Sequence, residues 1–197
     1  MIKNYVLPLM VLLMMFMSPK TLLANGTSEI ETNMKQVIGE VTSIIQDKSM
    51  AKPLRDAKVD ALVRPLFDFG LMGRLSLGKS AWKKLSKEER AEFSRLFEAR
   101  VMRSYMSKLD LYTDEVVVID DAIQVKSRIH LPTRLMRKNE KREILYKFYK
   151  SKKRGWLIYD VDILGVSIIQ TYRTQFAGIL KDDSFAVLLE KLQTSDS

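Results

Sequence analysis

Cysteine is absent from the 197 residues, and histidine occurs only once, at His130. Without cysteine there is no disulfide, no thiol nucleophile and no cysteine-based metal site, and a lipoprotein anchor, which needs a cysteine, is not expected. A single histidine argues against most zinc sites and against any histidine-based catalytic triad. The domain therefore has to be held together by its apolar core alone.

Long apolar runs are also missing, apart from a short one near the start. Lys3 precedes an apolar run over residues 5–17, interrupted by Pro8, and small and polar residues follow around Ala24. This order is typical of a secretory signal peptide, whereas a bilayer-spanning helix needs roughly 20 apolar residues. We predict a signal peptide over residues 1–24, cleaved after Ala24, and one exported domain over residues 25–197. An uncleaved membrane anchor is the alternative.

Acidic residues are fewer than basic residues. Lys and Arg number 33 against 24 Asp and Glu, a net charge of +9, and removal of the leader residues Lys3 and Lys20 leaves +7. Such a balance indicates a polyanionic partner: nucleic acid, an anionic membrane surface or an acidic protein patch. Export and the lack of any nucleic-acid-binding motif argue against nucleic acid.

Basic residues concentrate in two segments that flank a predicted strand. Because the strands are short, we expect adjacent hairpin ends to bring part of the two groups together. This density favours docking to an acidic partner or an anionic membrane, although most charge runs are only solvated surface. The candidate docking residues are Arg134, Arg137, Lys138, Lys141, Arg142, Lys150, Lys152, Lys153 and Arg154.

Apolar residues at three- and four-residue spacing predict helices on both sides of a central region of strands. The clearest helix begins at Ser86, which forms a capping box with Glu89, and ends near Lys108. Gly70 and Gly73 lower the helicity of the apolar segment over residues 67–77. The other predicted helices cover residues 29–47, 59–66, 168–180 and 185–192.

Alternating apolar and polar residues predict four consecutive strands with short connections. They cover residues 116–119, 122–131, 144–149 and 155–161, and Pro132 is expected to end the second strand before a basic loop. Helices, sheet and helices in this order predict an α+β fold, in which a twisted antiparallel sheet of about four strands is wrapped by helices.

The last two predicted strands are apolar on both faces. In the fourth, Trp156 and Ile158 alternate with Leu157, Tyr159 and Val161. Three explanations stay open: elements covering both faces, a dimer interface, or an apolar cavity between sheet and helices that holds a ligand. Lipid would suit such a cavity, because each buried CH₂ contributes about 0.8 kcal/mol without any polar contact.

Several segments resemble the MlaC family, whose members are also described as toluene-tolerance or ABC-transporter auxiliary proteins. They are FDFGLMGRLSLG (67–78), Trp82 with LSKEERAEF (85–93), RSYMSKLDLY (103–112) and GWLIYDVDILGVSIIQTYRTQF (155–176). The resemblance spans nearly the whole mature chain in order, and residues 120–154 resemble the family least.

The resemblance implies a periplasmic phospholipid carrier that is not an enzyme and has no metal and no cofactor besides its cargo. Such proteins pass lipid between an outer-membrane lipoprotein–porin complex and an inner-membrane ABC transporter with MCE-domain rings, and so maintain outer-membrane lipid asymmetry. The family fold holds acyl chains in an apolar cavity between sheet and helices. The wall residues that it implies, each of which could equally be ordinary core, are Phe69, Met72, Leu75, Val101, Tyr105, Tyr146, Phe148, Tyr159, Val161, Val166 and Ile169.

A few polar residues have structural explanations. Asp160 is expected to pair with Arg173 or to cap the next helix, and His130 to lie on the wet face of its strand. Arg74 and Arg173 lie in apolar segments, where they either mark the cavity mouth and contact a phosphate or form structural ion pairs. Two rival functions stay open: an adaptor that only docks partners, and a small isomerase-like enzyme, for which His130 is misplaced.

Overall fold

The computed structural model describes residues 21–107, 109, 115–138 and 140–194. Most of the predicted signal peptide therefore lies outside the described residues, and its last four residues fall within the first helix. Within the described ranges, no helix combines the length and the apolar character needed to cross a bilayer.

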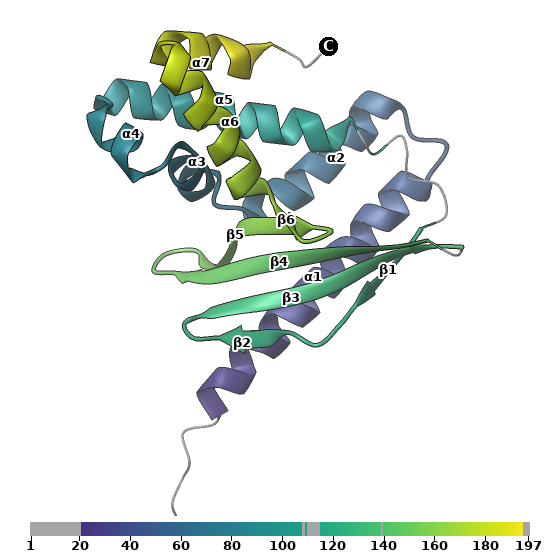
Figure 1. The fold of residues 1–197 in the computed structure, drawn as a ribbon. Helices are drawn as coiled ribbons and strands as arrows, with labels where there is room; N and C mark the ends of the chain where they lie inside the picture. Colours follow the sequence, from purple (N-terminus) through teal and green to yellow (C-terminus); the bar gives the residue numbers. More distant parts are fainter. Residues whose placement is uncertain (1–20, 108, 110–114, 139, 195–197) are drawn as a thin grey trace, which may run out of the picture.

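Helices stand at both ends of the described chain, with a sheet between them (Figure 1). The capping box is confirmed: Ser86 Oγ accepts a hydrogen bond from Glu89 N at 3.1 Å, and Glu89 Oε2 accepts one from Ser86 N at 2.7 Å. Gly78, with φ of 83°, ends one helix where an L side chain would be strained. The elements are α1 (Thr21–Gln46), α2 (Lys52–Val63), the 3₁₀ turn η1 (Arg64–Leu66), α3 (Phe69–Leu77), α4 (Lys79–Lys84), α5 (Lys87–Met106), α6 (Ile168–Asp182) and α7 (Phe185–Gln193).

The sheet is antiparallel, in the order β1-β3-β4-β5-β6, and β2 pairs with β3 beside β1. The α+β fold with a twisted antiparallel sheet is confirmed, with six strands in the described residues where about four were expected. They are β1 (Val116–Ile119), β2 (Ile123–Val125), β3 (Arg128–Arg137), β4 (Glu140–Ser151), β5 (Gly155–Ile163) and β6 (Val166–Ser167).

The expectation that Pro132 ends a strand is wrong. The chain turns earlier, at Lys126 and Ser127, so that the predicted strand over residues 122–131 is split between β2 and β3. Pro132 lies inside β3, opposite the gap between β1 and β2, and its carbonyl accepts a hydrogen bond from Asp120 N at 3.1 Å. The nitrogen of Pro132 points to the same side, where no strand residue is paired with Pro132. The missing N–H therefore breaks no hydrogen bond of the sheet.

The prediction of a basic loop over residues 134–142 is also wrong, because most of these residues lie in the paired strands β3 and β4. Arg134 faces Glu143 across the β3–β4 pair, and Arg137 faces Glu140. Opposite charges at directly paired positions stabilise an antiparallel ladder. The β3–β4 hairpin therefore continues well beyond the point where the apolar alternation stops.

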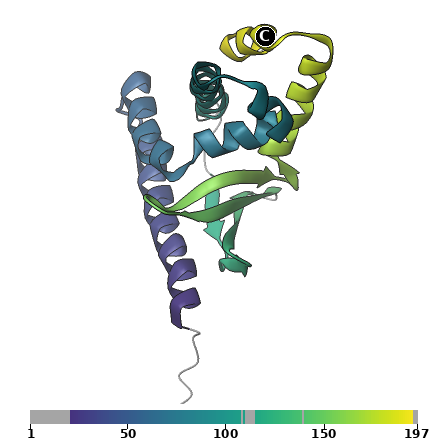
Figure 2. The same ribbon diagram turned by 90° about the vertical axis from the view of Figure 1, so that its left-hand side faces the viewer.

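Two layers cover parts of the sheet. In Figures 1 and 2, α1 runs along one face of the sheet, while α3 to α7 gather beyond β5. We call the α1 side the inner face and the opposite side the outer face. β5 is buried on both faces, with Ile158 and Val161 packed among inner-face residues and Tyr159 among the helices. Cover on both sides therefore explains the doubly apolar pattern of β5.

Candidate functional site

One of the two apolar clusters of the interior lies among the helices, and aromatic rings fill it. Phe93 and Phe97 are fully buried, and each meets Phe176 edge to face, with ring centroids 5.7 and 6.2 Å apart. Gly73 permits the close packing of α3, because a Cβ there would lie 3.2 Å from the ring of Phe97. Such interlocked rings are typical of a filled core. The buried members of this helix cluster are Phe69, Met72, Leu77, Phe93, Leu96, Phe97, Val101, Met102, Tyr159, Ile169, Phe176, Leu188 and Leu192.

The second cluster lies between α1 and the inner face of the sheet, and its buried members are mostly aliphatic. Gly26 seats α1 against the strands, because a Cβ there would lie 3.0 Å from Trp156 Cζ2 and 3.2 Å from Ile129 Cδ1. The helix contributes Ile30 and Met34 to the layer below it. We call this set the sheet cluster: Ile30, Met34, Ile129, Leu131, Phe148, Ile158, Val161 and Ile168.

Three aromatic side chains pack against both clusters: Phe67, Tyr105 and Tyr172, which we call the seam. Burial raises the pKa of Tyr105 far above its usual value, and nearby Tyr172 and Tyr146 raise it further. Burial also raises the pKa of Tyr146. Tyrosines from α5, α6 and β4 therefore share one low-dielectric region where the two clusters meet.

A groove of about 530 Å³ runs between α1 and β1, at the edge of the sheet. Ile38 and Ile119 line this α1–β1 groove and also pack against the sheet cluster, so the groove leads to that cluster from the surface. Its volume is within the range of about 300–1,000 Å³ that is typical of ligand pockets. Its lining residues are Lys35, Ile38, Gly39, Thr42, Ser43, Gln46, Glu115, Val116, Val117 and Ile119.

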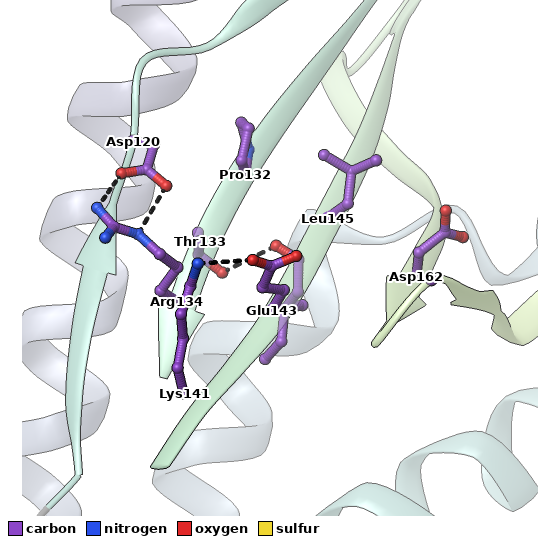
Figure 3. Close-up of a pocket in the computed structure, with 10 residues that line it drawn as sticks. Asp120, Pro132, Thr133, Arg134, Lys141, Glu143, Leu145 and Asp162 are labelled. Carbon is purple, nitrogen blue, oxygen red and sulfur yellow. Dashed lines mark hydrogen bonds and ion pairs between the residues drawn. The ribbon is translucent and has the colours of Figure 1, made fainter. Parts of the chain in front are cut away.

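A groove of about 450 Å³ on the outer face has several charged side chains in its lining (Figure 3). Arg134 Nε donates to Asp120 Oδ2 at 3.0 Å, and Lys141 Nζ lies 2.7 Å from Glu143 Oε1. Because both cations already have carboxylate partners, this groove is a poor site for an anion. It is lined by Asp120, Pro132, Thr133, Arg134, Lys141, Glu143, Ile144, Leu145, Asp162 and Gly165.

Asp160 is a buried carboxylate in a structural network. It accepts hydrogen bonds from Lys147 Nζ at 3.0 Å, from Ser167 Oγ at 2.8 Å and from Ile169 N at 3.3 Å. The expectation that it caps the following helix is confirmed, and its ion pair is with Lys147 and not with Arg173. Although burial lowers the pKa of Lys147, its bonds to Asp162 and Asp160 hold that pKa above the usual value.

These polar groups offer little for catalysis. Both oxygens of Asp160 are engaged, and His130 lies half-exposed on the outer face, away from both clusters. Burial, and then the neighbouring Lys147, lower the pKa of His130. In the part of the chain that the structure describes, no group of three or more His, Asp or Glu side chains is placed to hold a metal ion.

Comparison with known proteins identifies the relatives of this fold. The family model described as MlaC protein matches residues 35–194 of the chain. The chain belongs to the MlaC family. The MlaC-family resemblance of its separate sequence segments is thereby confirmed.

Two MlaC-like proteins illustrate how close the relatives are. The intermembrane phospholipid transport system binding protein MlaC of Haemophilus influenzae is 27% identical over 138 residues, which are 68% of this chain and 64% of that protein. The aligned part thus spans less than two thirds of that relative. A phospholipid-binding protein from Ralstonia solanacearum, solved in complex with a phospholipid, is 22% identical with a TM-score of 0.70, over 82% of this chain and 93% of that one. At this identity the likeness shows the fold.

The wall residues implied by the MlaC resemblance are divided between the two clusters and the surface. Neither groove contains any of them. Tyr105 lies at the seam, and Val166 is 61% exposed and belongs to neither cluster. Phe69, Met72, Leu75, Val101, Tyr159 and Ile169 belong to or pack against the helix cluster, whereas Tyr146, Phe148 and Val161 belong to or pack against the sheet cluster. Their role as walls stays a prediction.

The two groups of candidate docking residues lie far apart. The β3–β4 turn and the β4–β5 turn are at opposite ends of β4, whose 12 residues extend about 35 Å. The expectation that adjacent hairpin ends bring them together is therefore wrong, because consecutive turns of an antiparallel meander alternate between the two ends. Docking by either group stays a prediction.

Of the two arginines in apolar segments, Arg173 has a clear structural role. It donates two hydrogen bonds to the Leu75 carbonyl, at 3.0 and 2.7 Å, and so ties α6 to the end of α3. Neither an ion pair nor a cavity mouth is needed to explain it. Arg74 is exposed on α3.

Sequence reasoning missed the contribution of α1 and part of the seam. Ile30, Met34 and Ile38 were expected on one helix stripe, but nothing in the stripe indicates that it faces the sheet. The signal that could have found it is Gly26, a small residue in line with that stripe, four positions before Ile30. Phe67 and Tyr172 lie within the segments that resemble the family, so the same resemblance could have included them.

Proposed function

We propose that the protein is a phospholipid carrier of the MlaC type, which shields acyl chains inside the domain and leaves the headgroup in solvent. The single observation that carries this proposal is the continuity between the α1–β1 groove and the sheet cluster, in a chain that belongs to this family. The relative from Haemophilus influenzae is named for phospholipid transport, and the Ralstonia solanacearum structure holds a phospholipid, which supports the same ligand class.

The acyl chains in this proposal lie along the aliphatic sheet cluster and reach the surface through the α1–β1 groove. Each CH₂ that leaves water contributes about 0.8 kcal/mol, so chains of ordinary length bind without specific polar contacts. α1 packs on the inner face of the sheet and forms one wall of the groove. A small shift of α1 away from the sheet widens the space between Ile38 on α1 and Ile119 on β1. The seam forms the inner limit of the site.

We further propose that the protein is exported to the periplasm and shuttles lipid between an outer-membrane lipoprotein–porin complex and an inner-membrane ABC transporter bearing MCE rings. The leader pattern over residues 1–24 and the family membership support this assignment. In this proposal the protein is not an enzyme, and phospholipid is its cargo and not a cofactor.

Native mass spectrometry tests the proposal most directly. The mature protein, purified without detergent, should carry about one phospholipid per chain, which organic extraction then identifies. An empty protein that also takes up no lipid from vesicles would exclude a carrier and favour an adaptor that only docks partners.

A further inference from the structure

Six cations gather at one end of the sheet, where the β2–β3 turn and the β4–β5 turn lie side by side. Arg128 pairs with Tyr149 across β3 and β4, and Ser151 pairs with Gly155 two residues later, so the register brings the two turns together. Figure 1 shows both turns on the left and the β3–β4 turn on the right. All six side chains are exposed, and we call them the turn cations: Lys126, Arg128, Lys150, Lys152, Lys153 and Arg154.

None of the turn cations forms an ion pair within the described residues. Their partners are neutral. The Arg128 guanidinium lies 4.4 Å from the ring centroid of Tyr159 and donates to its hydroxyl, and Arg154 donates to the Pro65 carbonyl at 2.9 Å. Neutral partners leave the positive charge of all six side chains in place.

The opposite end of the same strands has a different balance. Arg134, Arg137, Lys141 and Arg142 lie beside Asp120, Glu115, Glu143 and Glu140 respectively. Four carboxylates there offset most of the positive charge, which weakens the field that a distant anion experiences. The turn cations are therefore the more strongly electropositive of the two ends.

Exposed apolar side chains lie next to the turn cations. Ile123 is 53% exposed and Val125 is 38% exposed, and both lie on β2 just before the turn at Lys126. Their cross-strand partners in β3 are His130 and Arg128, so both apolar side chains point to the outer face, as Arg128 does. Cations beside shallow apolar side chains are the combination that attaches a protein to the interface of an anionic bilayer.

We propose that the turn cations, with Ile123 and Val125, dock the protein on the surface of a bilayer that contains anionic phospholipid. Four of the six cations are lysines, which are compact, strongly hydrated charges suited to a diffuse negative surface, whereas bidentate pairing with carboxylates of a protein would favour arginine. This inference rests on the proposed function, since a lipid carrier has to approach a membrane or a membrane complex to load and unload.

Co-sedimentation of the mature protein with vesicles of phosphatidylglycerol and phosphatidylcholine tests this proposal. The triple variant K126Q/K152Q/K153Q removes three lysines that form no ion pair. At about 1 kcal/mol per basic residue near an anionic surface, it should bind these vesicles about 100-fold more weakly than the wild type. Wild-type binding should fall with added salt and be absent on phosphatidylcholine alone.

The matched control R137Q/K141Q/R142Q removes the same charge from the other end and should change vesicle binding by less than about threefold. Equal losses in both triple variants, no loss in the first, or a wild type that ignores anionic vesicles would each overturn the proposal, and the last outcome would indicate an acidic protein partner. Native mass spectrometry of the same samples reports the lipid cargo separately. An empty wild type would thus contradict the carrier function without deciding the docking result.

Discussion

The helix cluster and the sheet cluster differ in the side chains that fill them and in the helices that cover them. Five helices and many interlocked aromatic rings surround the first, whereas the second is mostly aliphatic and is covered mainly by α1, with Ile168 from the start of α6 at its border. Opening the helix cluster would separate several ring contacts at once. Opening the sheet cluster requires only that α1 move away from the inner face, which makes this cluster the better place for an exchangeable ligand.

The largest expected effect concerns the helix cluster. Phe97→Ala should lower the free energy of unfolding by about 3–5 kcal/mol, because it removes a fully buried ring that contacts Phe93, Tyr172 and Phe176. Urea unfolding of the lipid-free protein measures this loss. The amount of lipid per folded chain should not change.

Phe148→Ala is the matched substitution in the sheet cluster, where the ring is 4% exposed. We expect a smaller loss, about 2 kcal/mol, because α1 can settle onto the shortened side chain. Equal losses for the two variants would show that both clusters are equally rigid and would remove the distinction between them.

Substitutions at two valines of similar burial distinguish a side chain that contacts lipid from a side chain of the filled core. Val161, 5% exposed, belongs to the sheet cluster, and Val101, 3% exposed, belongs to the helix cluster. In Val161→Trp the indole should displace about two CH₂ groups of an acyl chain, at about 0.8 kcal/mol each, and weaken lipid uptake roughly tenfold. Val101→Trp should instead cost about 1–3 kcal/mol of stability through overpacking and leave uptake unchanged.

Lipid transfer from fluorescent vesicles, normalised to folded protein, measures the uptake of both valine variants. Thermal unfolding of the same samples measures their stability. If Val101→Trp lost uptake while Val161→Trp kept it, the acyl chains would lie among the helices, where most of the implied wall residues are found.

The sequence could predict what depends on neighbours along the chain. Ser86 and Glu89 are three residues apart, so their capping box follows from spacing alone. The alternation in β5 predicts its faces only up to a register shift at Tyr159, beyond which Val161 lies with Ile158 in the sheet cluster and not on the predicted face with Tyr159. Pro132 shows the limit. Whether a proline fits within a strand depends on which part of the neighbouring strands lies opposite its nitrogen, and that register comes from the turn at Lys126.

The candidate site was less predictable than the fold for the same reason. Tyr105, near the end of α5, and Tyr172, near the beginning of α6, come close only through the packing of the two helices, and nothing in either helix specifies this. The net charge at the two turns also depends on register. The charge of Arg137 is offset by Glu115, which lies just before β1, whereas Lys152 is exposed to solvent. Charge counted along the chain could not distinguish these cases.

Two glycines of α1 test how closely this helix lies on the sheet cluster. Gly39→Ala should raise the free energy of unfolding by about 0.5–1 kcal/mol, because a Cβ there meets nothing within 4 Å and alanine favours the helix. Gly26→Ala should lower it by about 1 kcal/mol, since the new methyl would press on Trp156 and Ile129. Chemical unfolding of both variants in the mature protein gives the comparison, and a stabilising Gly26→Ala would mean that α1 is not held closely there.

The smallest effect is expected on the outer face of β3, opposite the sheet cluster. Burial, and then Lys147 and Arg128, lower the pKa of His130, while Asp162 and Asp160 oppose this shift. The unfolded chain, with a histidine pKa near 6.5, then binds a proton at a higher pH than the folded chain does. Stability should therefore decrease as the pH falls below about 6.5, and level off below the folded-state pKa.

His130→Gln should remove this part of the pH dependence. Because the imidazole is half-exposed, solvent screening limits the difference to a few tenths of a kcal/mol. Urea midpoints of wild type and variant at about pH 7.5 and about pH 5 measure it, with carboxylate titration common to both proteins and cancelling in the difference. A wild type that gained stability relative to the variant on acidification would mean that His130 prefers to be charged in the fold. The surroundings of His130 would then favour its charged form. This would contradict the structure, in which burial and Lys147 lower the pKa of His130 more than Asp162 and Asp160 raise it.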